Sequence, residues 1–329
     1  MTTRRQFITL LGGAALAWPL AARAQQAAMP VIGYLHTASP KPFERYVGAF
    51  RQGLGDASFV EGQNVAIEYR WADGHYDRLP QLAADLVARR VALIVAQGGG
   101  TAPLAAKAVT SSIPIVFTSG RDPVKDGLVA SLNRPGGNLT GVHLLTNSLA
   151  PKRLEIVREL VPKADTVALL VYSENRLSSS QQIDETEAAA HALGLRMHVF
   201  SVGSATDFEP AFASMASKRI GALVVGADGY LSSQRDRIVA MAAHHSIPAI
   251  YEWRAYVEDG GLMSYGSDLA EGYRQVGRYA GRILKGEKTS ELPVVQSTKV
   301  EFVVNLRTAK ILGLTFPLPL IGRADEVIE

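Results

Sequence analysis

The chain has 329 residues, of which 47% are hydrophobic, and this length favours two lobes over one small domain. It contains no cysteine, which excludes disulfide frameworks, cysteine-ligated zinc, thiol nucleophiles and acylated-cysteine anchors. The formal charge of +3 comes entirely from Arg4, Arg5 and Arg23, because the rest of the chain holds as many basic as acidic residues, 31 of each. A neutral chain without a basic stripe excludes nucleic acid as a partner.

Residues 1–24 have the three zones of an export signal. Arg4 and Arg5 lie in a polar start, a glycine-broken apolar stretch covers 10–20, and small residues at 22–24 predict cleavage before Gln25. The apolar stretch is too short to span ~30 Å of hydrocarbon. The paired arginines followed by Gln-Phe-Ile resemble a twin-arginine signal, and a general secretory signal is the alternative. Either signal predicts an exported, soluble protein of the periplasm.

Short apolar runs alternate with helical patterns from residue 31 onward. Two helices are predicted where apolar side chains recur at i, i+3 and i+4, one containing Phe43 and Leu54 and one containing Leu79 and Val87. The apolar runs rich in Val and Ile predict buried strands at 31–35, 66–69, 92–96 and 115–118.

The same alternation restarts after residue 150. Strands are predicted at 167–171, 197–202, 222–226 and 249–251. Helices are predicted near 154–161, 184–193, 208–216 and 234–245. Strand–helix–strand order repeated twice predicts an α/β fold with two doubly wound parallel-sheet lobes.

The connections between the halves predict a hinge, because they contain no low-complexity linker. We interpret the turn-rich segment 134–142 as the first crossover between lobes. A last long helix carries Tyr273 and Ile283 on one face and stops at Gly286; a strand at 298–306 and an irregular end at 314–319 follow. The predicted lobes are 30–145 plus about 262–290, and 146–261 plus about 291–329.

Sequence motifs for catalysis are absent. The chain lacks a P-loop, a G-x-G-x-x-G after a strand, a G-x-S-x-G elbow and an H-E-x-x-H pair. The adjacent His244 and His245 fall at a predicted helix end, which accounts for them without a metal. We therefore expect no enzyme activity, no cofactor and no metal.

Polar residues cluster where predicted strands end, which is where open α/β sheets bind ligands. In the first lobe these are His36 and Ser39 after the first strand, Thr101 after 98–100 (Gly-Gly-Gly), and Asp122 after the fourth strand. Backbone N–H groups before a helix, with the Thr101 hydroxyl, suit a carboxylate. The alternative to ligand binding is a tight strand-to-helix turn for the glycines at 98–100 and a helix cap for Asp122.

The second lobe repeats this arrangement. Its candidate ligand-binding residues are Tyr172, Asn175, Asp228, Tyr230 and Trp253. Asp268 is a further candidate and follows the next predicted strand, in the segment of about 262–290 that is assigned to the first lobe. An exposed aromatic side chain at a loop tip can stack on a ring, although Tyr230 and Trp253 could equally pack between helices. Asp268 ends a strand and starts a helix, so it is either an N-cap, an anchor for a ligand ammonium, or both.

Several segments together resemble the ABC transporter substrate-binding family that includes tryptophan and tyrosine binders. They are VEGQNV at 60–65, RDPV at 121–124, GLVASL at 127–132, PGGNLTG at 135–141, YGSD at 265–268, ILKGEK at 283–288 and NLRTAK at 305–310. The resemblance covers residues 30–316. It implies a type I periplasmic binding protein, with two lobes, three crossovers and a ligand in the cleft.

The resemblance also implies site residues and partners. Thr101, Asp122, Asn175, Asp228 and Asp268 match polar positions in the family's cleft loops, whereas the loops at 36–40 and 98–100 depart from them. The expected protein is a monomeric receptor that passes a small solute, such as an amino acid or aromatic compound, to a membrane permease with a cytoplasmic ATPase. The alternative is a ligand-sensing periplasmic module that signals to a membrane sensor.

Overall fold

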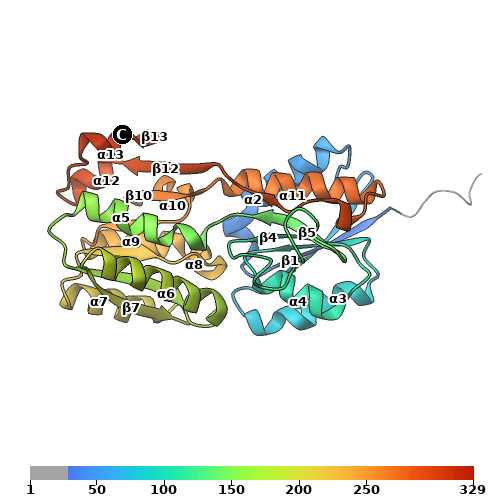
Figure 1. Ribbon diagram of the computed structural model, residues 1–329, viewed down its shortest axis with the longest axis horizontal. Helices are drawn as coiled ribbons and strands as arrows, with labels where there is room; N and C mark the ends of the chain where they lie inside the picture. Colours follow the sequence, from blue (N-terminus) through green and yellow to red (C-terminus); the bar gives the residue numbers. More distant parts are fainter. Residues whose placement is uncertain (1–28) are drawn as a thin grey trace, which may run out of the picture.

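The computed structural model describes residues 29–329, so the predicted export signal lies outside the described residues. Two lobes lie side by side, each a sheet covered by helices (Figure 1). Within residues 29–329, no helix combines the length and apolar character that crossing a membrane requires.

The first lobe is built on a six-stranded parallel sheet in the order β11-β5-β4-β3-β1-β2. Its strands are β1 (Val31–His36), β2 (Ala66–Trp71), β3 (Leu93–Gln97), β4 (Ile115–Ser119), β5 (Leu139–His143) and β11 (Val295–Gln296). Its helices are α2 (Pro40–Asp56), η1 (Tyr76–Arg78), α3 (Leu79–Ala88), α4 (Thr101–Val109), α11 (Leu269–Leu284) and η3 (Thr289–Glu291). The central strands β3 and β4 are buried throughout, as their continuous apolar sequences predict.

The second lobe is built on a seven-stranded sheet in the order β13-β12-β10-β9-β8-β6-β7, in which only the β10–β12 pair is antiparallel. Its strands are β6 (Thr166–Tyr172), β7 (Arg196–Val202), β8 (Ala222–Val225), β9 (Ala249–Tyr251), β10 (Met263–Ser267), β12 (Val300–Asn305) and β13 (Glu326–Ile328). Its helices are η2 (Asn147–Leu149), α5 (Ala150–Leu160), α6 (Arg176–Ala192), α7 (Phe208–Ser217), α8 (Gly229–Ser233), α9 (Arg235–His244), α10 (Arg254–Glu258), α12 (Leu306–Ile311) and α13 (Leu318–Ile321). The α/β fold with two parallel-dominated sheets is confirmed.

The chain passes between the sheets three times, after β5, after β10 and after β11. The segment 134–142, interpreted as the first crossover, instead forms a turn within the first lobe and enters β5, so the crossover follows His143. The strand β10 belongs to the second sheet and β11 to the first, whereas the sequence placed them the other way round. Strand pairing decides this membership, and it is not encoded in the local pattern.

Helix α11 returns the chain to the first lobe and packs along α2 (Figure 1). Two glycines permit this close approach: a Cβ atom at Gly53 would lie 1.9 Å from the carbonyl oxygen of Arg274, and one at Gly277 would lie 2.1 Å from that of Phe50. The N-terminus of α11 lies next to the cleft, so this contact fixes part of the site.

Candidate functional site

A cavity lies between the lobes, at the carboxyl ends of the parallel strands. Its volume of about 60 Å³ has room for several water molecules, since one water needs roughly 10–15 Å³. Side chains and backbone of both lobes line it: Phe43, Gly98, Gly99, Gly100, Thr118, Gly120, Arg121, Leu144, Leu269 and Tyr273 from the first lobe and its crossovers, and Thr146, Asn147, Asn175, Ser178, Ala227, Asp228, Gly229, Ser232 and Trp253 from the second.

Asp228 is the carboxylate in the second lobe's wall of the cavity. Its Oδ1 accepts hydrogen bonds from the backbone N–H of Tyr230 (2.7 Å), which caps α8, and from the hydroxyl of Tyr76 (3.0 Å). Its Oδ2 accepts from Nδ2 of Asn175 (2.7 Å). Burial raises the pKa of Asp228 to about 6, against the opposing effect of these three donors. The carboxylate is therefore ionised at neutral pH and pre-oriented at the cavity.

The first lobe contributes the N-terminal end of α4 to the opposite wall. Gly98 and Gly99 have φ of +88° and +110°, a region that favours glycine, and a Cβ atom at Gly98 would lie 2.1 Å from Oγ1 of Thr37. Gly100 is the N-cap of α4, with no side chain capping the first turn and no acid in it. Gly98, Gly99 and Gly100 line the cavity, so the uncapped N-terminal end of α4 borders it.

An apolar wall joins the two polar ends. It consists of Phe43 from α2, Trp253 before α10, and Leu269 and Tyr273 from α11. His36 holds Tyr273 in place: Nδ1 of His36 accepts the N–H of Ala38 (2.9 Å), so the protonated Nε2 donates to the Tyr273 hydroxyl (2.9 Å). Burial lowers the pKa of His36 to about 3, which keeps the imidazole neutral.

Hydrogen bonds outside the cavity cross the cleft. The hydroxyl of Tyr172 donates to the carbonyl of Gly74 (2.7 Å), and the ring of Tyr172 stacks on Tyr230 with centroids 4.3 Å apart. The guanidinium of Arg121 donates to the carbonyl of Leu177, and Arg235 donates to that of Pro42 (3.1 Å). These contacts hold the two lobes together around the cavity.

Glu252 and Arg153 are fully buried ionisable side chains behind the cavity wall. Oε1 of Glu252 accepts from the hydroxyl of Ser232 (3.0 Å), and burial raises the pKa of Glu252 to about 8 although Arg153 opposes the shift. Arg153 donates to the carbonyls of Thr146 (3.0 Å) and Tyr265 (3.3 Å), which lie beside the first and second crossovers. Arg153 thus ties two crossover segments together.

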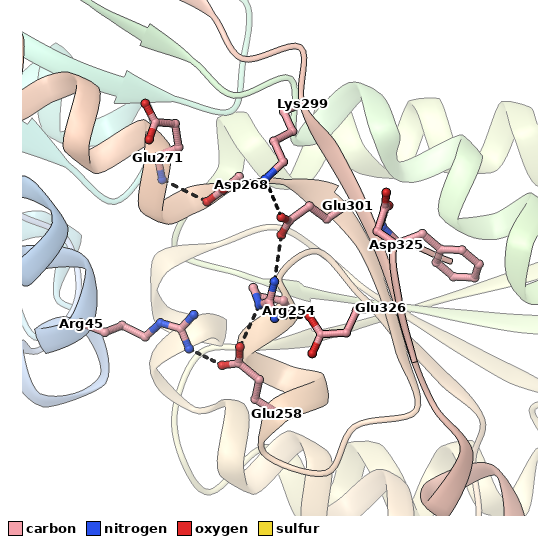
Figure 2. Close-up of polar contacts among 10 residues, drawn as sticks. Arg45, Arg254, Glu258, Asp268, Glu271, Lys299, Glu301, Asp325 and Glu326 are labelled. Carbon is pink, nitrogen blue, oxygen red and sulfur yellow. Dashed lines mark hydrogen bonds and ion pairs between the residues drawn. The ribbon is translucent and has the colours of Figure 1, made fainter. Parts of the chain in front are cut away.

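Asp268 lies outside the cavity, in a chain of ion pairs at the hinge (Figure 2). Its Oδ1 accepts the N–H of Glu271 (3.0 Å) and so caps α11, and its Oδ2 pairs with Nζ of Lys299 (3.3 Å) on the third crossover. From Lys299 the series of ion pairs continues through Glu301, Arg254 and Glu258 to Arg45 on α2.

The structure brings three of the predicted site residues to the cavity and places the others outside it. Asn175, Asp228 and Trp253 line it. Tyr172, Tyr230 and Thr101 line a neighbouring hollow between the lobes. His36 lies behind Tyr273, Ser39 is the N-cap of α2, and Asp122 accepts the backbone N–H groups of Val124 and Lys125 (2.9 and 3.2 Å).

The cavity residues that the sequence did not indicate are of two kinds. Phe43, Leu269 and Tyr273 follow the apolar period of a helix, and this pattern predicts side chains buried in the hydrophobic core rather than side chains that line a cavity. Thr118, Thr146, Asn147, Ser178 and Ser232 are small polar residues, of which only Thr118 lies in a predicted strand, so strand-end position could have indicated that one.

The chain was compared with known proteins. The model of the ABC transporter substrate binding protein family matches residues 38–328. The chain belongs to this family. Family members bind small molecules and serve membrane transporters, and the family is one of solute-binding proteins rather than enzymes. In the part of the chain that the structure describes, no group of three or more His, Asp or Glu side chains is placed to hold a metal ion.

Individual relatives of this ABC transporter substrate-binding protein support the assignment. A tyrosine-binding protein of Clostridioides difficile (strain R20291) is 28% identical over 265 residues, which are 80% of this chain and 75% of the relative. A Streptococcus pneumonia domain solved in complex with L-Trp is 27% identical, with a TM-score of 0.81 over 92% of this chain and all of the other. A ligand-free, open Clostridium difficile substrate-binding protein with adhesive properties is 25% identical, with a TM-score of 0.63 over 91% of this chain and 99% of the other.

Proposed function

We propose that this protein is the periplasmic receptor of an ABC importer and that it captures an amino acid by closing its two lobes. The observation that carries the proposal is a cavity lined by both lobes, so a ligand in it completes its contacts only when the lobes meet. A ligand that binds one arrangement of the lobes more tightly shifts the population toward it.

The arrangement of the lobes supports closure. Tyr172, Arg121 and Arg235 each bridge the cleft by a hydrogen bond. The fold is more similar to the L-Trp complex (TM-score 0.81) than to the ligand-free, open structure (0.63). The L-Trp complex and the tyrosine-binding protein make an amino acid the first ligand class to test.

A melting-temperature screen of the mature protein against a solute library tests the receptor function. A ligand at 1,000 times its Kd stabilises the folded protein by about 4 kcal/mol, so its signal is large. Solution scattering should then show a smaller radius of gyration with ligand than without. An unchanged radius at saturation contradicts closure, and amino acids that leave the melting temperature unchanged contradict the ligand class.

Export to the periplasm and the monomeric state also remain part of the proposal. Changing Arg4 and Arg5 together to Lys should leave unprocessed precursor inside the cell, because the twin-arginine pathway requires that pair. Normal periplasmic accumulation of this variant would assign export to the general secretory route. Light scattering of the purified protein should give the mass of one chain.

A further inference from the structure

One ion pair joins a helix of the first lobe directly to a helix of the second. Arg45 on α2 pairs with Glu258 on α10 (Figure 2). Within residues 29–329, every other ion pair lies inside one lobe or involves a crossover segment, as the pair of Asp268 and Lys299 does. Movement of one lobe away from the other would therefore separate two full charges at this place.

Other contacts hold both partners of this pair in position. The guanidinium of Arg45 lies over the ring of Tyr46, 5.0 Å from its centroid. Oε1 of Glu258 accepts from Nε of Arg254 (2.8 Å), and Arg254 also pairs with Glu326 (2.5 Å). An isolated surface ion pair contributes little, because ordering two long side chains costs entropy, whereas a network of charges reduces that cost. The pair between the lobes therefore forms from side chains that are already oriented.

The series of ion pairs runs on from α10 to the hinge. Arg254 pairs with Glu301 on β12 (3.5 Å). Lys299 on the third crossover then pairs with Glu301 (3.0 Å) and with Asp268, the N-cap of α11 (3.3 Å). Because α11 packs along α2, the series starts and ends on helices of the first lobe and passes through the second. Its hinge end lies on the crossovers about which the lobes would turn, so the pair between α2 and α10 is the link that opening breaks.

Solvent ions can reach the pair between α2 and α10. The exposed fraction of the side chain is 41% for Arg45 and 33% for Glu258. The Debye length falls from about 10 Å at 0.1 M to about 3 Å at 1 M ionic strength, and exposed charges are screened accordingly. The attraction between the two side chains should therefore weaken as salt is added.

We propose that Arg45 and Glu258 form a salt-sensitive latch that stabilises the closed arrangement of the two lobes. This inference rests on the closure in the proposed function and adds a dependence on ionic strength to it. Neither residue lines the ligand cavity, so the latch acts on the balance between open and closed lobes and not on the contacts of a bound ligand. Low salt favours the closed lobes, and high salt favours the open ones.

The absence of cysteine from the chain allows the two arrangements to be measured with site-specific labels. Lys125→Cys and Ser180→Cys place one spin label at an exposed position of each lobe, on either side of the contact between Arg121 and Leu177. Electron paramagnetic resonance then gives the label separations and the fraction of molecules at each. Without added ligand, we expect the ratio of short to long separations to fall about 2- to 5-fold between about 0.05 M and about 1 M NaCl.

Variants of the pair separate the latch from general effects of salt. Arg45→Met keeps an apolar stem beside Tyr46 and removes the charge, so at low salt its ratio should already equal that of the parent at high salt. Glu258→Gln breaks the same pair from the second lobe and should reproduce this result, whereas Arg45→Lys keeps the charge and should restore the response to salt. The control is Asp165→Asn, which removes an ion pair with Arg196 inside the second lobe and should behave as the parent.

The outcomes distinguish the latch from the receptor function. A ratio that does not respond to salt in the parent, a single separation at every salt concentration, or a full response to salt in Arg45→Met overturns the latch. In each of these cases a ligand from the melting-temperature screen that shortens the separation leaves closure on ligand binding intact. A bound ligand that leaves the separation unchanged overturns closure, and the latch with it.

Discussion

Buried acids in this protein differ in how many donors surround them. Asp228 accepts three hydrogen bonds and its pKa rises to about 6, whereas Glu252 accepts one, from Ser232, and its pKa rises to about 8. Hydrogen-bond donors stabilise the charged carboxylate. Asp228 accepts more hydrogen bonds than Glu252, so Asp228 is the side chain that stays ionised at neutral pH. Two acids in one lobe therefore hold different charges at neutral pH, and Asp228 is the one that lines the cavity as an anion.

The pH dependence of binding follows from Asp228. The proposed amino-acid ligand carries an ammonium and Asp228 lines the cavity as a carboxylate, so affinity should be steady above about pH 7 and fall as the pH drops through 6, by about tenfold at pH 5. Titrating calorimetry between pH 5 and 8 checks this. The groups facing Asp228 are Tyr76, Asn175, Tyr230 and, behind Ser232, Glu252. A profile that Asp228→Asn leaves unchanged would contradict the assignment.

Glu252 should make the folded chain less stable as the pH rises, which is the opposite direction to the pH dependence of ligand binding. Its pKa is about 8 when folded against 4.5 as the ordinary value, so folding favours the protonated form. That stabilisation is complete below pH 4.5 and is lost as the pH rises through 8. Glu252→Gln removes the ionisable group, so the variant does not lose this stability as the pH rises. Between pH 5 and 8 its unfolding free energy should exceed that of the parent by up to a few kcal/mol.

The control for Glu252→Gln is Glu155→Gln, which changes a surface side chain paired with Lys152. Chemical denaturation of both variants across this pH range gives the comparison. Asp228 contributes a slope of the same sign between pH 3.8 and 6, but it is common to parent and variant and cancels. Parallel curves for parent and Glu252→Gln would show that Glu252 ionises freely in the fold.

At the scale of elements, the contact between α2 and α11 depends on glycine. Gly53→Ala would place a methyl group 1.9 Å from the Arg274 carbonyl, which forces the helices apart. We expect a loss of roughly 1–3 kcal/mol of stability by denaturation. Gly48→Ala is the matched control in the same helix, where a Cβ atom meets nothing within 4 Å, and it should stabilise by about 0.5–1 kcal/mol. Equal effects would contradict this view of the contact.

Elements and their order could be predicted from the sequence, but their partners could not. Apolar runs such as those of β1 and β3 indicate strands because burial on both faces requires them. The segment before β5 contains Pro-Gly-Gly, and a turn within one lobe uses the same residues as a crossover between two. Which of the two sheets β10 and β11 join depends on which sheet has a free edge strand. That is a property of the assembled sheets and not of the local sequence.

The site shows the same limit. Asn175, Asp228 and Trp253 follow strands, where the topology of an open sheet concentrates ligand contacts, and they reach the cavity. Asp268 also follows a strand, but its carboxylate turns to cap α11 and to pair with Lys299. Side-chain direction separates the two aspartates, and strand-end position alone does not specify it.

At the scale of the whole molecule, the hydrogen bond from Tyr172 to Gly74 joins the two lobes, so the proposed opening of the lobes would break it. Tyr172→Phe should therefore weaken ligand binding by about 2- to 10-fold, the effect of one lost hydrogen bond of roughly 0.5–1.5 kcal/mol. Tyr279→Phe is the control, because its hydroxyl bonds to the carbonyl of Pro293 (2.7 Å) within one lobe. That variant should melt lower and bind normally; equal affinities for both would contradict a closing role for Tyr172.

The three crossovers also determine the order in which the two lobes are completed during translation. Translation finishes β3, β4 and β5 early, but α11, which covers them beside α2, is synthesised only after nearly all of the second lobe. A nascent chain that has reached β10 thus has a first lobe lacking α11 and β11 and a second lobe lacking β12 and β13. Both lobes therefore have their full set of strands and helices only when the last sixty or so residues have emerged, so we expect the two lobes to complete folding together.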